Sequence, residues 1–558
     1  MYILGITGPI SWNNAAAIIK DGRLIATAEE ERFNGIKYSP RMFPRNAIKF
    51  CLKEANITFD NIDYIAVGFG TPNKFLYASY ASYLLKFRFR PFIKQNNYVS
   101  DPFAGIDAYF TYLKEMRKLN EMMKGRKKEI KFIPHHRAHA ASTFFVSGMN
   151  KANIITLDGR GESESTFLGV GENGRINQME TYDVHNSLGN LYSSFTHLLG
   201  FGSHRDEGKI MGLATYGKPV FDLDDVVQIT RKGYKFDKNW FSTVANIVGR
   251  QRKPEEEINE HHKNLAASVQ YKLEQVGKKL AEVMYDKTGI PNFCLAGGVA
   301  LNCDMNAKIL GMPFTKDIFI QPASHDAGTA LGAAFELYSQ LGYKTNFVME
   351  HAYYGPEFSD EEIEKVLKES KAIYSYQKDI EGVVAEKLAK GFIVGWCQGK
   401  LELGPRALGN RSILANPSIA EMKDKVNKEV KHRENWRPFA PSVLDRACDE
   451  YFENYYNSPF MLLTFDTKKK KQKELAAAIH IDGTARIQTV VKRINPRYYK
   501  MIEAFEDETG IPAVLNTSFN DAGDPIVLGP KEAIKTFYST GLDYLAVGNF
   551  LLEKKKLK

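Results

Sequence analysis

Cysteine is scarce in this sequence, and the few cysteines that occur lie far apart along the chain. They are Cys51, Cys294, Cys303, Cys397 and Cys448, and no two of them form a CxxC pair. This scattering gives no sign of a zinc ribbon or of a disulfide framework. It is typical of a protein that acts in the reducing cytoplasm, which is where we expect this chain to be found.

Long apolar runs are also missing. No stretch approaches the roughly 18 uninterrupted apolar residues of a membrane span. The first residues, MYILGITGPISW, lack a basic segment followed by a long apolar run, so they do not read as a secretory signal. Tandem repeats and sizeable low-complexity tracts are absent as well. We therefore expect no membrane partner.

Charge is present in ordinary amounts, and its balance is basic. Charged residues make up 25% of the chain and hydrophobic residues 44%, as in globular proteins. With 558 residues the chain exceeds one ordinary core, so two or more domains are expected. The net charge of +9 suits anionic small substrates such as phosphates. The interleaved aromatics and arginines of nucleic-acid binders are missing, so nucleic acid is not expected as a partner.

Histidine is concentrated in one short stretch, HHRAHAAST, residues 135–143. His135 and His139 stand at i and i+4, which on a helix places both rings on one face, where they can grip one metal ion. Zinc proteases use the same spacing with a glutamate beside the first histidine, and that glutamate is missing here. A metal at this site would act on something other than a protease's water. The alternative is a helix start with two surface histidines and one buried histidine.

Two strand–turn–strand units open two halves of the first 350 residues. The first runs through a hairpin at Asp21-Gly22, and the stretch 153–176 repeats the design. This pattern is that of the actin/hexokinase/Hsp70 superfold, in which each turn approaches the phosphates of a nucleotide. In the stretch 291–306 a buried strand ends at Gly297-Gly298 and a helix begins near Asn302, as expected for a backbone that passes close to adenosine.

Two aspartates end predicted strands of these halves. Asp158 and Asp326 each follow a β-branched or apolar run, and ligands of open α/β sheets bind at such strand ends. Together with the two histidines they form a set suited to iron(II) or zinc(II). Taken separately, the two aspartates could instead cap a turn and a helix.

Near residue 355 the composition changes. Pro356 and Asp360 indicate a linker followed by a capped acidic helix. We therefore expect an N-terminal domain over residues 1–357 and a second domain over residues 358–558.

Gly-flanked cations stand out in several stretches. Gly208-Lys209 lies within 206–217, where Lys209 could contact a phosphate or simply belong to a Gly-rich helix start. In the second domain, Arg406 and Arg411 have glycine neighbours, and further basic and hydroxyl residues occur at 431–441 and 515–520. Guanidiniums in this context form a cradle for a phosphate or carbamoyl group.

The residues now described resemble the NodU/CmcH O-carbamoyltransferase family over essentially the whole chain. Eight stretches in the family's order carry the resemblance: AEEERF (28–33), HHRAHAAS (135–142), DEGKIMGLA (206–214), LAGGVALN (295–302), ELGPRALGNRSILANP (402–417), RENWRPFAP (433–441), DGTARIQTV (482–490) and LNTSFN (515–520).

The resemblance implies an α/β protein with a two-lobed actin-like N-terminal domain, related to the tRNA threonylcarbamoyl-transfer proteins, and a YrdC-like α/β C-terminal domain. It implies that carbamoyl phosphate and ATP, the latter with Mg²⁺, give carbamoyl adenylate. The carbamoyl group then passes to a hydroxyl of a small acceptor.

The resemblance also assigns residues. The metal, iron(II) first and zinc(II) as the alternative, would be held by His135, His139, Asp158 and Asp326. The adenylate would be lined by Gly208, Lys209, Gly297, Gly298 and Asn302. Carbamoyl phosphate and ATP would be bound by Lys400, Arg406, Arg411, Ser412, Arg437, Asn516, Ser518 and Asn520. Catalysis would rest on His135, His139, Lys209, Arg406 and Arg411.

One departure from the family concerns the first loop. Family members carry a histidine shortly after the first strand, whereas GITGPISWNNAAAI (5–18) has none. This leaves open the identity of the acceptor, and with it the alternative of a non-catalytic nucleotide- and metal-binding relative. A threonylcarbamoyl-type tRNA modification enzyme is a further alternative, which ranks lower because it needs no separate C-terminal module of this type. Whether the chain forms a homodimer is also left open.

Overall fold

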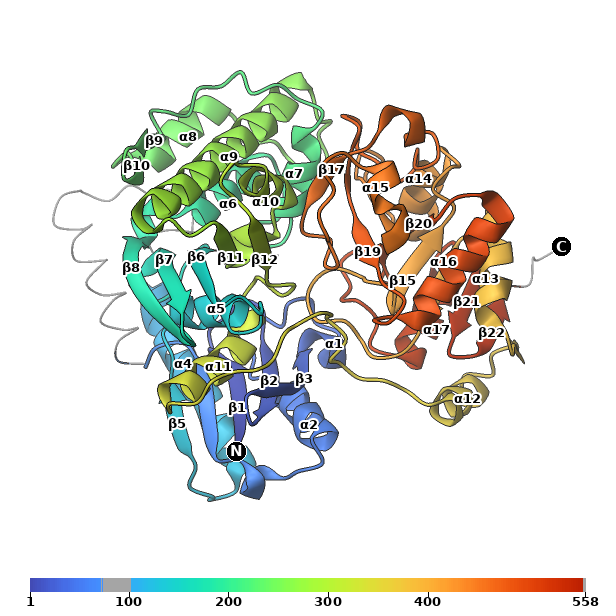
Figure 1. Cartoon of the computed structure of the whole chain (residues 1–558), viewed down its shortest axis with the longest axis horizontal. Coiled ribbons are helices and arrows are strands. Elements are labelled where there is room, and N and C mark those ends of the chain that lie inside the picture. The colour runs from blue at the N-terminus through green and yellow to red at the C-terminus, as the bar shows by residue number, and fades with distance from the viewer. Residues whose placement is uncertain (72, 74–101, 555–558) are drawn as a thin grey trace.

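The first sheet is formed by the N-terminal segment of the chain. A computed structural model describes residues 1–71, 73 and 102–554 (Figure 1). The sheet has the order β3-β2-β1-β4-β5 and consists of β1 (Tyr2–Thr7), β2 (Ala15–Lys20), β3 (Arg23–Glu29), β4 (Tyr64–Gly68) and β5 (Glu129–Phe132). The expected hairpin is confirmed, since Asp21 and Gly22 take positive φ angles of 49° and 73° between β2 and β3.

A second sheet repeats this arrangement. Its order is β12-β11-β6-β7-β8, with β6 (Lys151–Leu157), β7 (Glu164–Glu172), β8 (Arg175–Asp183), β11 (Asn292–Ala296) and β12 (Asp317–Ile320). In both sheets the first three strands form an antiparallel meander and the last two run parallel to the first strand. This duplication is the actin-like architecture that the sequence predicted.

Two helices lie between the two sheets and form the centre of the core (Figure 1). Helix α5 (His135–Phe144) packs on the second sheet, α11 (Gly328–Gln340) packs on the first, and the helices contact one another. The contact is close, because a Cβ on Gly332 would lie 1.9 Å from the carbonyl oxygen of Ala138. The small residues of α11 therefore allow the histidine helix to approach closely the helix that follows Asp326.

The remaining helices of this part surround the two sheets or line the space toward the C-terminal part. They are α1 (Glu31–Asn34), α2 (Arg45–Glu54), α4 (Pro102–Met123), α6 (Leu188–Leu198), α7 (Glu207–Ala214), α8 (Trp240–Val248), α9 (Glu260–Thr288) and α10 (Cys303–Leu310), with a hairpin of β9 (Val227–Thr230) and β10 (Gly233–Phe236). None of the helices in the described ranges is long and apolar enough to cross a bilayer.

A third, eight-stranded sheet takes all its strands from residues 374–553. Its order is β13-β22-β21-β14-β15-β20-β16-β19, and it mixes parallel and antiparallel pairs. The strands are β13 (Tyr374–Tyr376), β14 (Val394–Cys397), β15 (Arg411–Ala415), β16 (Ala440–Leu444), β19 (Gln488–Val490), β20 (Ala513–Ser518), β21 (Tyr544–Val547) and β22 (Phe550–Glu553).

Helices pack on both faces of this sheet. They are α12 (Asp360–Glu369), α13 (Ile380–Ala389), α14 (Met422–Lys425), α15 (Cys448–Tyr451), α16 (Pro496–Thr509) and α17 (Pro530–Ser539), with a small pair β17 (Thr464–Asp466) and β18 (Thr484–Arg486). The expected cap of α12 is present, because Ser359 and Glu362 form a capping box. The YrdC-like fold of this part and the boundary at residue 357 stay predictions.

Candidate active site

A large cavity lies between the actin-like lobes and the C-terminal sheet. Its volume is about 1960 Å³. Pockets for one small ligand measure roughly 300–1,000 Å³, so this cavity has room for more than one. Residues from the loop after β1, from α7, from the loop before α11 and from the stretches 405–407, 428–439 and 516–526 line it.

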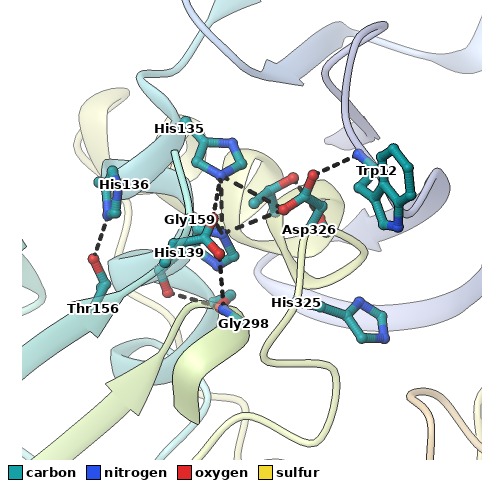
Figure 2. Close-up of polar contacts among 12 residues, drawn as sticks. Trp12, His135, His136, His139, Thr156, Gly159, Gly298, His325 and Asp326 are labelled. Atoms are coloured by element: carbon teal, nitrogen blue, oxygen red, sulfur yellow. Dashed lines mark hydrogen bonds and ion pairs between the residues drawn. The ribbon is translucent and has the colours of Figure 1, made fainter. Parts of the chain in front are cut away.

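The predicted histidines and aspartates come together (Figure 2). Asp158 and Asp326 line the cavity, and the two buried histidines lie behind them without lining it. Helix α5 starts at His135, directly after Pro134, so its first turn carries both His135 and His139 on one face. Their Nε2 atoms are 3.1 Å apart. Asp158 follows β6 and lies 3.1 Å, through Oδ2, from His135 Nε2, while Asp326 Oδ1 lies 3.7 Å from the same nitrogen. We call these four residues the His–Asp cluster.

Burial and mutual charge shape the protonation of the cluster. Both histidines are at most 1% exposed. Burial opposes the charged form of His135, but the hydrogen bond to Asp158 and the charge of Asp326 outweigh it and raise the pKa of His135 to about 9. Burial and the neighbouring His135 lower the pKa of His139. Although burial works against it, hydrogen bonding with the two histidines holds the pKa of Asp158 well below its usual range.

Backbone groups fix the outer carboxylate oxygens. The Trp12 N–H donates to Asp326 Oδ2 at 2.7 Å, and the Gly298 N–H donates to Asp158 Oδ1 at 3.1 Å. The other oxygen of each aspartate then faces the histidines. One ligand atom from each of the four residues lies within 4.8 Å of the other three. Two imidazoles and two carboxylates that converge in this way fit a borderline divalent metal.

The third histidine of the stretch takes no part in the cluster. Figure 2 shows His136 turned away, with its Nδ1 2.7 Å from Thr156 Oγ1, and its Nε2 lies 3.1 Å from the carbonyl oxygen of Glu164. Burial and the nearby His135 lower the pKa of His136 to about 3. His136 therefore belongs to the core as a neutral, satisfied side chain.

The loop that lacks a histidine contributes its backbone. Besides the Trp12 contact to Asp326, this loop places Ser11 and Asn13 at the cavity. The Trp12 ring lies 5.5 Å from that of His204, which also lines the cavity. An imidazole from another segment thus lies near the position where the family's histidine was expected.

Most of the expected adenylate residues reach the cavity. Gly208 and Lys209 lie at the start of α7, and Gly298 and Asn302 lie between β11 and α10, all at the cavity wall. Gly297 does not line it. Its φ of 87° and a virtual Cβ only 2.2 Å from the Leu157 carbonyl oxygen show that it lets β6 and β11 approach closely.

The opposite side of the cavity is strongly positive. Arg406 and Arg437 lie there as expected, with Asn516, Ser518 and Asn520. Other cations also line the cavity, and we call the following six the cationic wall, four of them additional to those predicted: Lys37, Arg406, Lys431, Arg433, Arg437 and Arg486. The four additional residues lie near or within stretches that the sequence singled out, but no spacing rule indicates which basic side chains point inward.

Repulsion between members of the cationic wall contributes to their lowered pKa values. Burial first, and the charge of Arg486 next, lower the pKa of Arg406. Burial and Arg433 hold the pKa of Lys431 well below its usual range. Burial and Arg437 do the same to the pKa of Arg433. Such crowded cations favour an anionic ligand, because its charge would offset their repulsion.

Three expected members of the anion site lie elsewhere. Arg411 opens β15, is 1% exposed, and donates to five carbonyl oxygens, those of Pro356, Gln398, Gly399, Asn410 and Leu528. Ser412 is buried and accepts from the Gly409 N–H. Lys400 pairs with Glu54. None of the three lines the cavity. Gly409, with a φ of 97°, lies between Arg406 and Arg411, and the two arginines face different surroundings.

Two protein-family models match the sequence of this chain. The family model described as the carbamoyltransferase N-terminus matches residues 2–335, and that of the carbamoyltransferase C-terminus matches residues 385–554. The chain belongs to the carbamoyltransferase family. It is therefore a transferase that takes a carbamoyl group from a donor to an acceptor.

Three proteins are similar in sequence to this carbamoyltransferase. An uncharacterized protein of Synechocystis, sll1178, is 36% identical over 99% of this chain and 97% of its own. Nodulation protein NolNO of Sinorhizobium fredii is 38% identical over 97% of this chain and 79% of its own. The 3'-hydroxymethylcephem-O-carbamoyltransferase of Amycolatopsis lactamdurans is 29% identical over 62% of this chain and 64% of its own.

Proposed function

We propose that this carbamoyltransferase uses ATP and carbamoyl phosphate to form carbamoyl adenylate and passes the carbamoyl group to a hydroxyl of a small acceptor. The observation that supports the proposal is the shared cavity, which is lined both by the two aspartates of the His–Asp cluster and by the cationic wall. A polyanionic donor and a hydroxylated acceptor can therefore occupy one cavity.

The proposed reaction balances in three steps. Carbamoyl phosphate gains water and loses phosphate, which leaves carbamate. A carbamate oxygen attacks the α-phosphorus of ATP, and pyrophosphate leaves with the electron pair of the broken P–O bond. The acceptor oxygen then attacks the carbamoyl carbon, AMP leaves, and the acceptor's proton is lost.

In the first two steps the cationic wall has an electrostatic role. Arg406 and Arg437 would offset the negative charge on the transferring and leaving phosphates, because guanidiniums donate several hydrogen bonds in a fixed plane. Lys431 Nζ holds the 518–520 loop in place through the Asn520 carbonyl oxygen at 2.6 Å and the Ser518 carbonyl oxygen at 2.9 Å. The Gly208-Lys209 turn would meet the same ligand from the actin-like side. We assign these adenylate-forming steps to residues 358–558.

The transfer step belongs to residues 1–357 in this proposal. His135, His139, Asp158 and Asp326 would hold a divalent metal, iron(II) first and zinc(II) as the alternative, because imidazoles suit softer ions than magnesium. When bound, such an ion supplies a Lewis acid for a carbonyl or hydroxyl oxygen. The Trp12 and Gly298 N–H groups orient the two carboxylates.

The test is pyrophosphate release from ATP, which should require carbamoyl phosphate and should fail in Arg406→Ala. A screen of hydroxylated metabolites for the mass gain of one carbamoyl group then identifies the acceptor. Carbamoylation of tRNA in place of small compounds would favour the threonylcarbamoyl-type function. No pyrophosphate release with any donor would favour a non-catalytic relative.

A further inference from the structure

A buried ion pair lies where the actin-like lobes meet the C-terminal part of the chain. Glu29 ends β3 and Arg32 belongs to the short helix α1, and their side chains are only 3% and 2% exposed. Arg32 Nη2 donates to Glu29 Oε1 at 3.1 Å, and its Nη1 lies 2.7 Å from Glu31 Oε1. Burying these charges is unfavourable unless each is paired and hydrogen-bonded, so the pair needs its partners in place.

The pair also holds one residue of the C-terminal part by its backbone. Gly404 donates its N–H to Glu29 Oε1 at 2.9 Å, and its carbonyl oxygen accepts from Arg32 Nη2 at 2.9 Å. Both backbone polar groups of Gly404 are therefore bound by the ion pair. Arg406 of the cationic wall lies two residues further along.

The same pair reaches the loop that carries Asp326. Glu29 Oε2 lies 3.8 Å from Nε2 of His325, the residue before Asp326. Gly404 itself packs on this loop, because a Cβ at position 404, where φ is 97°, would lie 2.5 Å from the carbonyl oxygen of Pro322. Glycine allows this approach, so the two loops pack closely at this position.

We infer that Glu29 and Arg32 are positioning residues that fix the loop 404–406 against the loop 322–326. Neither residue is assigned a contact with a reacting atom. Their effect is to hold Arg406 of the cationic wall at a set place relative to Asp326 of the His–Asp cluster, so that the intermediate passes between the two sites without leaving the cavity. This consequence rests on the proposed function, whereas the fixed position of the two loops does not.

Glu29→Gln and Arg32→Met test the inference, with the exposed Glu361→Gln as the control. Each variant is given ATP and carbamoyl phosphate labelled in the carbamoyl carbon, together with resin-bound primary amine that is too large to enter the cavity. We expect ATP-dependent label on the resin, per pyrophosphate released, to rise about tenfold over wild type in both variants, since displacements near 1 Å at an active site have effects of up to roughly 100-fold. If the ratio is unchanged in both variants, the intermediate does not escape from them, and the claim that the pair keeps it in the cavity fails.

Amide hydrogen exchange tests the loops independently of the reaction. Peptides over 318–327 and 400–408 should exchange about tenfold faster in both variants, while peptides over β9–β10 should not change. Equal exchange rates in variant and wild type would overturn the positioning role. If wild type releases no pyrophosphate, the proposed function fails and the exchange measurement alone decides the inference.

A double variant, Glu29→Gln with Arg32→Met, guards against simple loss of folding. It leaves neither Glu29 nor Arg32 as a lone buried charge, while Glu31 loses its Arg32 partner as it does in Arg32→Met, so we expect its thermal unfolding midpoint to be closer to wild type than that of Arg32→Met. It should still show the faster exchange. Wild-type exchange in the double variant would mean that the single variants acted only through buried charge, and the inference would fail.

Discussion

Lys209 and Glu434 join the two sides of the cavity: Lys209 Nζ lies 3.2 Å from Glu434 Oε1, and the two residues come from opposite parts of the chain. Lys209 also lies 3.5 Å from Asp206 Oδ2 and sits above the Phe201 ring. In the free protein the ammonium group is thus held at the cavity wall by carboxylates rather than left in solvent. An arriving phosphate would compete with these carboxylates for Lys209.

Replacement of Lys209 by alanine should weaken ATP binding and leave stability nearly unchanged. A hydrogen bond between a charged donor and a phosphate contributes roughly 1.5–3 kcal/mol, so we expect the KM for ATP to rise about tenfold or more. The ion pair is half-buried, and its loss should change the free energy of unfolding by no more than ~1 kcal/mol. Steady-state kinetics and urea unfolding measure both quantities. The control is Lys368→Ala, which removes an exposed i, i+4 pair with Glu364, and an equal KM in the two variants would contradict the role of Lys209.

Replacement of His139 by alanine should remove the metal and block transfer while sparing pyrophosphate release. The reason is that His139 supplies one of the four convergent ligand atoms but lies outside the cationic wall. Elemental analysis of the purified variant measures the first effect and the pyrophosphate assay the second. His136→Gln is the matched control, since His136 neighbours the cluster without belonging to it, and this variant should keep the metal. Unchanged metal content in His139→Ala would defeat the assignment.

Arg406 and Arg411 should differ in what their replacement by alanine destroys. Arg406 faces other cations, so its loss should abolish pyrophosphate release without lowering stability. Arg411 satisfies five carbonyl oxygens in the interior, so its loss should lower the free energy of unfolding by roughly 3–5 kcal/mol. Urea unfolding and the pyrophosphate assay on both variants check this. Equal destabilisation by the two substitutions would show that the contrast between them is mistaken.

Binding of ATP should take up protons under mildly alkaline conditions. Lys431 has a pKa well below its ordinary value in the free protein because of burial and the neighbouring Arg433, and a bound polyanion would raise it again. Between the lowered pKa and the ordinary value near 10.4, the free protein is short of a proton that the complex holds, so affinity falls as pH rises through that window. Calorimetry in two buffers of different ionisation enthalpy measures the uptake. The control Lys431→Met should show less uptake, and proton release by wild type would contradict the expectation.

Several features of this protein could be predicted from its sequence because they depend on local geometry. The i, i+4 spacing of His135 and His139 placed both rings on one helix face, and Asp21-Gly22 set the first hairpin, because both depend only on the geometry of neighbouring residues. The two strand–turn–strand units predicted the duplicated lobes for the same reason.

Only the tertiary structure decided which polar side chains share the cavity. Arg406 and Arg411 look alike in the sequence, yet the chain turns at the positive-φ Gly409 between them, and one faces the cavity while the other faces the interior. Glu29 and Gly404 are 375 residues apart and meet through a hydrogen bond that no local pattern indicates. The direction of a side chain across a domain contact depends on how whole sheets and helices pack, and that packing is settled by the fold rather than by neighbours in the chain.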